Sequence, residues 1–140
     1  MQKVIIDTNV LVSALIQRSY PYRILYELVL EDTIRLCISG SLLAEYYDVL
    51  NRPKFRQYQD FAVKANAILA GIAIKAERYV PAVKLDLISD QDDNKLVELA
   101  EACMADYIIT GNTTDFTFPR YKQTKIVTPR EYWEQYRPIH

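Results

Sequence analysis

The stretch Val4-Ile5-Ile6-Asp7-Thr8-Asn9 decides the fold of this chain. Its first three residues form a short apolar run rich in β-branched side chains, which is typical of a strand covered on both faces in a parallel sheet. The run ends abruptly at Asp7, and helical spacing begins at residue 9. A buried strand that passes directly into a helix predicts a parallel α/β arrangement.

The same alternation of strand and helix continues along the chain. Further strands are predicted at 34–39, 107–109 and 125–127, with a short one at 79–80. Helical spacing covers 9–16, 21–31, 42–50, 60–76 and the segment from 90 to 103, and a capping-box pattern at 128–131 starts a last helix. Ser41 is expected to cap the helix at 42–50. We therefore predict the α/β class, as a three-layer α/β/α sandwich around a mainly parallel sheet of four to five strands.

Composition predicts one soluble domain over residues 1–140. Half of the 140 residues are apolar, which is enough to bury a sizeable core. The 17 basic and 18 acidic residues leave a net charge of −1, so any attraction to phosphate must be local. Cys37 and Cys103 lie in apolar segments, which favours buried thiols and a reducing compartment. No secretion signal is recognisable and no apolar run approaches 18 residues, so we expect a cytoplasmic protein with no membrane partner.

Two acidic residues are expected at the carboxyl edge of the predicted sheet, where ligands bind in such folds. Asp7 follows the first strand directly and is explained equally well as a helix cap. Glu45 lies one turn into the helix after the second strand, beside its apolar arc, whereas Asp48 is expected to point further toward water. An ordinary surface glutamate is the alternative for Glu45.

A second acidic group lies at the start of the helix that precedes residues 107–109. Asp90, Asp92 and Asp93 crowd this helix start, where capping explains only one of them and the others repel unless a cation is present. Asp93, already inside the helix, is our candidate for the pocket. Asp115 follows the strand at 107–109 in a polar loop, whereas Asp106 begins that strand and is expected at the opposite edge, away from the chemistry.

The residue types at this edge favour a hard divalent cation over other kinds of site. Carboxylate oxygens suit Mg²⁺ or Mn²⁺. The lone histidine is His140 and no cysteines are closely paired, which argues against a zinc site and leaves Ser/His/Asp or Cys/His catalysis without a base. Three glycines cannot form a dinucleotide fingerprint or a Walker A loop.

Four motifs together resemble the PIN-domain ribonucleases, and most closely the VapC-type toxins of prokaryotic toxin–antitoxin systems. They are Asp7-Thr8-Asn9-Val10, Ser39 through Glu45, Asp92-Asp93-Asn94-Lys95 and Thr110-Gly-Asn-Thr-Thr-Asp115-Phe116. The resemblance implies a PIN-like fold and metal-assisted hydrolysis of RNA by one or two Mg²⁺ or Mn²⁺ ions. It makes Asp7, Glu45, Asp93 and Asp115 the metal-site residues, supported by Thr8, Asn9, Ser39, Asp92, Thr110 and Asn112. Many relatives have aspartate where this chain has Asn112, so the fourth ligand stays open between Asn112 and Asp115.

The resemblance also implies partners: an RNA substrate, a small antitoxin protein and a second copy of the chain. Cationic contacts to RNA are expected from Arg52, Lys54 and Arg56, and from a second cluster of Arg120, Lys122 and Lys125, although solvated surface is the commoner explanation of such a cluster. The tyrosine-rich helices at 20–30 and 42–50 offer a homodimer face by analogy. Trp133, Tyr132 and Tyr136 on the last helix are expected to dock against the sheet rather than against a base.

Two other functions remain open at this level. A metal-dependent phosphatase or phosphotransferase also places an aspartate after its first strand, but the haloacid dehalogenase type requires a second acid two residues on, where this chain has Asn9. The other alternative is a non-catalytic PIN-like module that binds protein or nucleic acid and uses its acids only to cap helices.

Overall fold

The structure is a computed structural model that describes residues 1–85, 91–113, 116 and 118–139, without the side chains of residues 91 and 92. Its central sheet has the strand order β3-β2-β1-β4-β6-β5. Every neighbouring pair is parallel except β5 and β6. The strands are β1 (Lys3–Ile6), β2 (Arg35–Ile38), β3 (Glu77–Arg78), β4 (Tyr107–Ile109), β5 (Arg120–Tyr121) and β6 (Thr124–Val127).

The sheet of the described residues has six strands, whereas the sequence predicted four to five. Both two-residue strands, β3 and β5, lie at the edges of the sheet. The short strand predicted at 79–80 is found at 77–78, and the Tyr79 N–H still donates to the Ile38 carbonyl oxygen at 2.8 Å. The strand β5 was missed altogether. Two residues carry no readable periodicity, so pairing with a neighbouring strand decides whether they form a strand.

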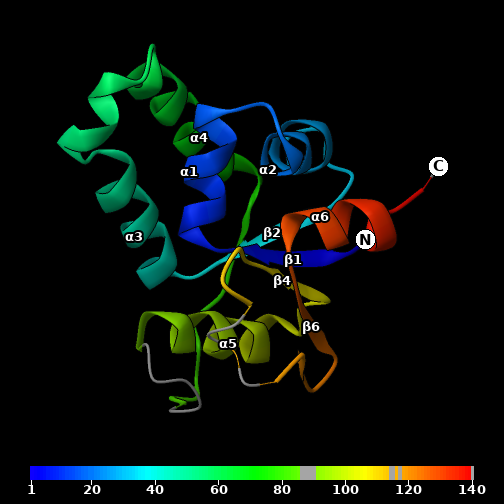
Figure 1. Ribbon diagram of the computed structural model, residues 1–140. Coiled ribbons are helices and arrows are strands. Elements are labelled where there is room, and N and C mark those ends of the chain that lie inside the picture. The colour runs from blue at the N-terminus through cyan, green and yellow to red at the C-terminus, as the bar shows by residue number, and fades with distance from the viewer. Residues whose placement is uncertain (86–90, 114–115, 117, 140) are drawn as a thin grey trace.

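The helices cover both faces of this sheet and confirm the three-layer α/β/α sandwich. Figure 1 shows α5 on one face and α1, α4 and α6 on the other. The π-helical turn η1 continues α2, and η4 continues α6. The bounds are α1 (Thr8–Ile16), α2 (Tyr20–Arg23), η1 (Ile24–Val29), α3 (Gly40–Leu50), the 3-10 helix η2 (Pro53–Gln57), α4 (Phe61–Lys75), α5 (Gln91–Cys103), α6 (Pro129–Glu131) and η4 (Tyr132–Tyr136).

The cap of α3 differs from the prediction. Ser39, not Ser41, is the N-cap, and its Oγ accepts a hydrogen bond from the Leu42 N–H at 3.1 Å. The helix therefore begins as soon as β2 ends, and the serine that directly follows the strand is the one in extended backbone conformation that a cap requires. This places the whole first turn of α3 at the carboxyl edge of the sheet.

The C-terminal helix packs on the sheet through its tyrosines, as predicted. The capping box of Thr128 and Glu131 is present. The buried Tyr132 ring lies 5.3 Å from the Tyr107 ring of β4, and the Tyr136 ring lies 5.2 Å from it. Trp133 is partly buried against the core, and the Arg137 guanidinium lies over its ring, 4.1 Å from the centroid.

The central strands and the helices that cover them bury one contiguous apolar core. Val4 and Ile5 of β1 are fully inaccessible to solvent, as expected of a strand covered on both faces. Cys37 and Cys103 are both buried with free thiols, in agreement with the sequence prediction. Within the described residues, the longest apolar helices are too short to span a bilayer.

Candidate active site

Two polar residues leave neighbouring strands at the same level of the sheet. The strands β1 and β4 pair Ile6 with Ile109, so Asp7 and Thr110 are the next residue of each. The Thr110 hydroxyl donates to Asp7 Oδ2 at 2.8 Å, and the Asp7 N–H donates to the Ile109 carbonyl oxygen at 3.0 Å. Parallel register therefore holds the first acid at the carboxyl edge of the sheet.

The Asp7 carboxylate does not cap α1, although the residue occupies the N-cap position. Within α1, which is described in full, its side chain makes no capping hydrogen bond. The residue is only 8 % exposed, and burial raises the pKa of its carboxyl above the ordinary value of 3.8. The negative charge of Glu45 raises this pKa further, while the Thr110 hydroxyl and the Thr8 and Asn9 amides oppose the shift. Burial and the nearby negative charge disfavour the ionised form of Asp7, which a neighbouring cation would stabilise.

Glu45 reaches the same place from α3. The Thr8 hydroxyl donates to its Oε2, and the Lys95 ammonium of α5 lies 3.1 Å from its Oε1. Both partners of this ion pair are largely buried, with about a fifth of each side chain exposed. Asp48 points to solvent, as predicted. Three helices thus meet at Glu45, which is not an ordinary surface glutamate.

These acids line one cavity of about 210 Å³ at the carboxyl edge. Three of the four predicted acids, Asp7, Glu45 and Asp93, face it. The cavity walls are formed by Asp7, Thr8, Asn9, Glu45, Val49, Arg52, Lys54, Phe55, Asp93 and Asn112. Among the described residues, no three His, Cys, Asp or Glu side chains converge closely enough to form a ready-made metal centre. The carboxylates therefore surround a common space rather than closing on one point.

The supporting residues separate into two kinds. Asn112 lies in the cavity wall, and its N–H donates to the Thr110 hydroxyl at 3.1 Å, so the two polar residues after β4 are linked. Ser39 is buried but acts as the cap of α3. Asp115 and the side chain of Asp92 lie outside the described residues, which leaves the choice between Asn112 and Asp115 open.

Two of the six basic residues predicted to contact RNA lie at the cavity. Arg52 and Lys54 line the cavity beside the acids, whereas Arg56, Arg120, Lys122 and Lys125 are not among its lining residues. Lys122 pairs with Glu101 of α5 at 2.6 Å. Asp106 lies at the opposite edge, as predicted, where its Oδ2 accepts from the Lys3 N–H at 2.9 Å.

Sequence reasoning missed three contributors to the site. Lys95 was part of a quoted motif but was given no role, and its spacing of two from Asp93 on a helix does not predict a shared face. Val49 and Phe55 line the cavity as apolar residues, and nothing in their local sequence distinguishes them from core residues. All three reach the site only because α3, η2 and α5 meet above the sheet edge.

The fold and the cavity define an α/β protein with a carboxylate site at the carboxyl edge of a parallel sheet. The chain belongs to the PIN-domain family, since the family profile described as PIN domain matches residues 3–114. Membership indicates a nuclease-type function and a nucleic-acid substrate. The chain is also similar to the uncharacterized protein MJ1680 of Methanocaldococcus jannaschii, with 32% identity over 143 residues, which covers 96% of this chain and 91% of the relative.

Proposed function

We propose that this chain is a Mg²⁺- or Mn²⁺-dependent ribonuclease that hydrolyses RNA phosphodiesters, formed by residues 1–140 as a single PIN-like domain. The observation that carries this proposal is the cavity in which Asp7, Glu45 and Asp93 stand beside Arg52 and Lys54. The carboxylates can bind a divalent metal ion. The positive side chains of Arg52 and Lys54 beside them can bind the phosphates of a nucleic acid. The fold and the family support the nuclease class.

The donor set fits a hard divalent cation. It consists of carboxylate oxygens, and Asp7 is buried with a raised carboxyl pKa, so it gains from a positive neighbour. Asp7 and Asp93 would hold the ion, with Asn112 or Asp115 as a further oxygen ligand. A bound Mg²⁺ lowers the pKa of a coordinated water and neutralises charge that develops on the phosphate.

The chain's own residues prepare the site for this chemistry. Thr110 orients the Asp7 carboxylate through its hydrogen bond, and Thr8 orients Glu45. Arg52 and Lys54 would bind the phosphates on either side of the cleaved bond. In the hydrolysis, a water oxygen forms a bond to phosphorus as the bond to the leaving oxygen breaks, and the leaving oxygen takes up a proton.

Removal of metal tests the proposal directly. We expect a fluorophore–quencher RNA to be cleaved in Mn²⁺, to be left intact in EDTA, and to be cleaved again when Mn²⁺ is restored. Mn²⁺ at 100 times its Kd should stabilise the folded protein by about 2.7 kcal/mol in thermal unfolding. Cleavage that persists in EDTA would contradict the metal mechanism. Metal binding and RNA binding without cleavage would instead support a non-catalytic module.

The ion pair between Lys95 and Glu45 leads to a second prediction. Lys95→Met removes a cation that partly neutralises the acids, so Mn²⁺ meets a more negative cavity and its Kd should fall several-fold in calorimetric titration. The metal-free variant should be less stable by about 1 kcal/mol, because Glu45 then lacks its partly buried ion-pair partner.

Lys122→Met is the matched control for this substitution. It breaks a more exposed ion pair, with Glu101 of the same helix, α5, outside the cavity. We expect it to leave the Mn²⁺ affinity unchanged. Weaker Mn²⁺ binding by Lys95→Met than by the wild type would show that Lys95 does not oppose the metal.

We further propose that the protein is the toxin of a cytoplasmic toxin–antitoxin pair of the VapC type, with a small antitoxin as partner and a homodimer as its assembly. Support comes from the resemblance of the four motifs and from the exposed Tyr47 on α3, a helix suggested for the dimer face. Light scattering measures the assembly. Neutralisation of the nuclease by the product of a neighbouring small reading frame tests the pairing.

A further inference from the structure

Phe55 occupies an unusual place for an apolar side chain. It lies on η2, between α3 and α4, and among the residues that the structure describes it is the one aromatic side chain lining the acidic cavity. Its ring is partly buried against the core and stacks on the Phe61 ring, with centroids 5.0 Å apart and planes inclined by 21°. One side of the ring is therefore supported, which holds its orientation.

Two cations accompany this ring. The Lys54 ammonium lies over the Phe55 ring, 5.1 Å from its centroid. Arg52, which follows α3 and pairs with Asp48 at 3.2 Å, lines the same cavity. The cavity thus runs from carboxylates to a wall made of an aromatic ring and two positive charges. A site that only binds metal and a phosphate needs no aromatic wall. A nucleotide has a phosphate, which the positive side chains can bind, and a flat base, whose face can stack on the aromatic ring.

We propose that Phe55 is the nucleobase platform of the site. The base of an unpaired nucleotide, next to the phosphate held at the acids, displaces the exposed Lys54 ammonium from the ring and stacks there. Lys54 and Arg52 then contact the phosphates of that nucleotide. The proposal rests on the proposed ribonuclease function, which it deepens by naming the residue that binds a base. Stacking on an aromatic ring tolerates any base, so Phe55 sets the position of the strand rather than its sequence.

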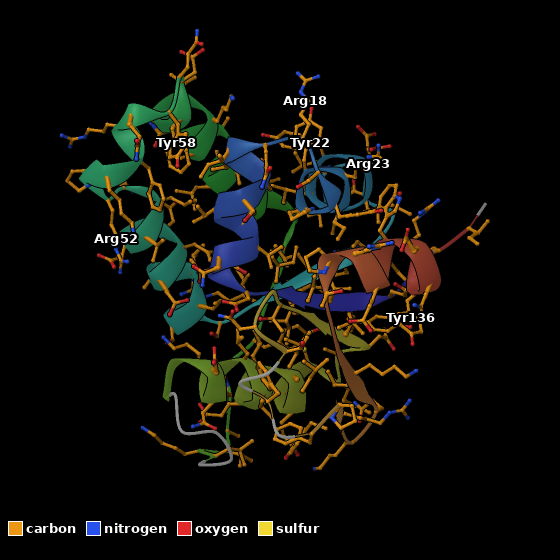
Figure 2. All side chains as sticks on the ribbon, in the orientation of Figure 1. Arg18, Tyr22, Arg23, Arg52, Tyr58 and Tyr136 are labelled. Atoms are coloured by element: carbon orange, nitrogen blue, oxygen red, sulfur yellow. The ribbon has the colours of Figure 1, made fainter. Side chains whose placement is uncertain are left out.

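The competing explanation is that Phe55 only fills space between η2 and α4. Tyr58 provides the comparison, because its ring also approaches Phe61, at 6.4 Å between centroids, but it does not line the cavity. Figure 2 shows Tyr58 and Arg52 on the part of the molecule formed by α3 and α4. A purely structural role would make substitutions of Phe55 and Tyr58 similar in their effect on RNA.

The experiment compares two ligands: an eight-nucleotide RNA of uridine and the same ribose–phosphate chain without bases. Binding is measured by fluorescence anisotropy in an Asp7→Asn background, so that no cleavage occurs. We expect Asp7→Asn to bind the uridine RNA roughly tenfold more tightly than the abasic chain, in line with stacking of one base. Phe55→Leu, which keeps an apolar side chain, should reduce this ratio to near one and leave the affinity for the abasic chain unchanged.

Two further variants complete the test. Phe55→Trp should restore the ratio, because it keeps an aromatic surface, and Tyr58→Leu should not change it. Equal weakening of both ligands by Phe55→Leu, an unchanged ratio, or the same loss of ratio in Tyr58→Leu would overturn the platform. Circular dichroism confirms folding, and if Phe55→Leu does not fold, the Phe55→Trp and Phe55→Met pair gives the same comparison.

These outcomes are distinct from failure of the proposed function. If the wild type cleaves RNA with Mn²⁺ and Phe55→Leu keeps the base preference, the platform is wrong and the nuclease stands. If the base preference depends on Phe55 but the wild type does not cleave RNA, hydrolysis is wrong and the platform stands as a binding site.

Discussion

Replacing Asp7 with asparagine is expected to abolish Mn²⁺-dependent RNA cleavage and also to raise the stability of the metal-free protein. Asparagine keeps the shape and an oxygen that can accept from Thr110, but it loses the charge that would hold the ion. The cleavage rate should fall roughly 100-fold or more. The Tm without metal should rise, because the wild type carries a buried charge that faces Glu45.

The pH dependence of this difference follows from the sign of the pKa shift. Burial raises the pKa of the Asp7 carboxyl above 3.8, so the folded state binds its proton more tightly than the unfolded state does. That contribution to stability is present at low pH and is lost as the pH rises through the folded-state pKa. The difference in Tm between Asp7→Asn and the metal-free wild type should therefore widen as the pH rises from 3.8 to the folded-state pKa, and stay constant above it.

Thermal unfolding in EDTA, recorded across this range of pH, measures the effect. Saturating Mn²⁺ should reverse the order, because only the wild type then gains from the ion. A variant that is less stable than the wild type at neutral pH without metal would show that Asp7 is held for a structural reason. A variant that still cleaves RNA at the wild-type rate would remove Asp7 from the active site.

The second large effect is expected at Asp93. It is 8 % exposed, lies near the start of α5 and lines the cavity with Asp7. Asp93→Asn removes one of the two acids proposed to bind the ion directly, so RNA cleavage should again fall roughly 100-fold, and the Kd for Mn²⁺ should rise at least tenfold. Single-turnover cleavage and calorimetric titration measure the two quantities.

Asp106→Asn is the matched control, since it makes the same chemical change in an acid at the opposite edge of the sheet. Its side-chain oxygen accepts from the Lys3 N–H, and asparagine can keep that hydrogen bond. We expect cleavage and Mn²⁺ affinity within about twofold of the wild type. Equal losses in the two variants would mean that the carboxyl edge is not the place of the chemistry.

The elements with a strong local pattern were predicted close to their observed bounds. The apolar run before Asp7 became β1, residues 107–109 became β4, and the capping box at Thr128 starts α6. These segments could be predicted because a strand buried on both faces requires consecutive apolar residues, and a capping box requires specific residues at fixed spacing. The segment 21–31 was predicted as one helix, but it divides into α2 and the π-helical turn η1. The sequence did not predict this division because a change in hydrogen-bond register hardly alters the spacing of apolar residues.

The sequence by itself determined the parallel sheet and the edge where its polar residues gather. The ends of strands can be recognised from local sequence, and parallel strands bring their carboxyl ends to one edge of the sheet. The sequence therefore predicts that Asp7 and Thr110 lie at the same edge. Tertiary structure decided the rest of the site. Lys95 reaches Glu45 across 50 positions of the chain, and Phe55 enters the wall because it packs on Phe61. Such contacts depend on how helices cross above the sheet, which the spacing of residues along one helix does not encode.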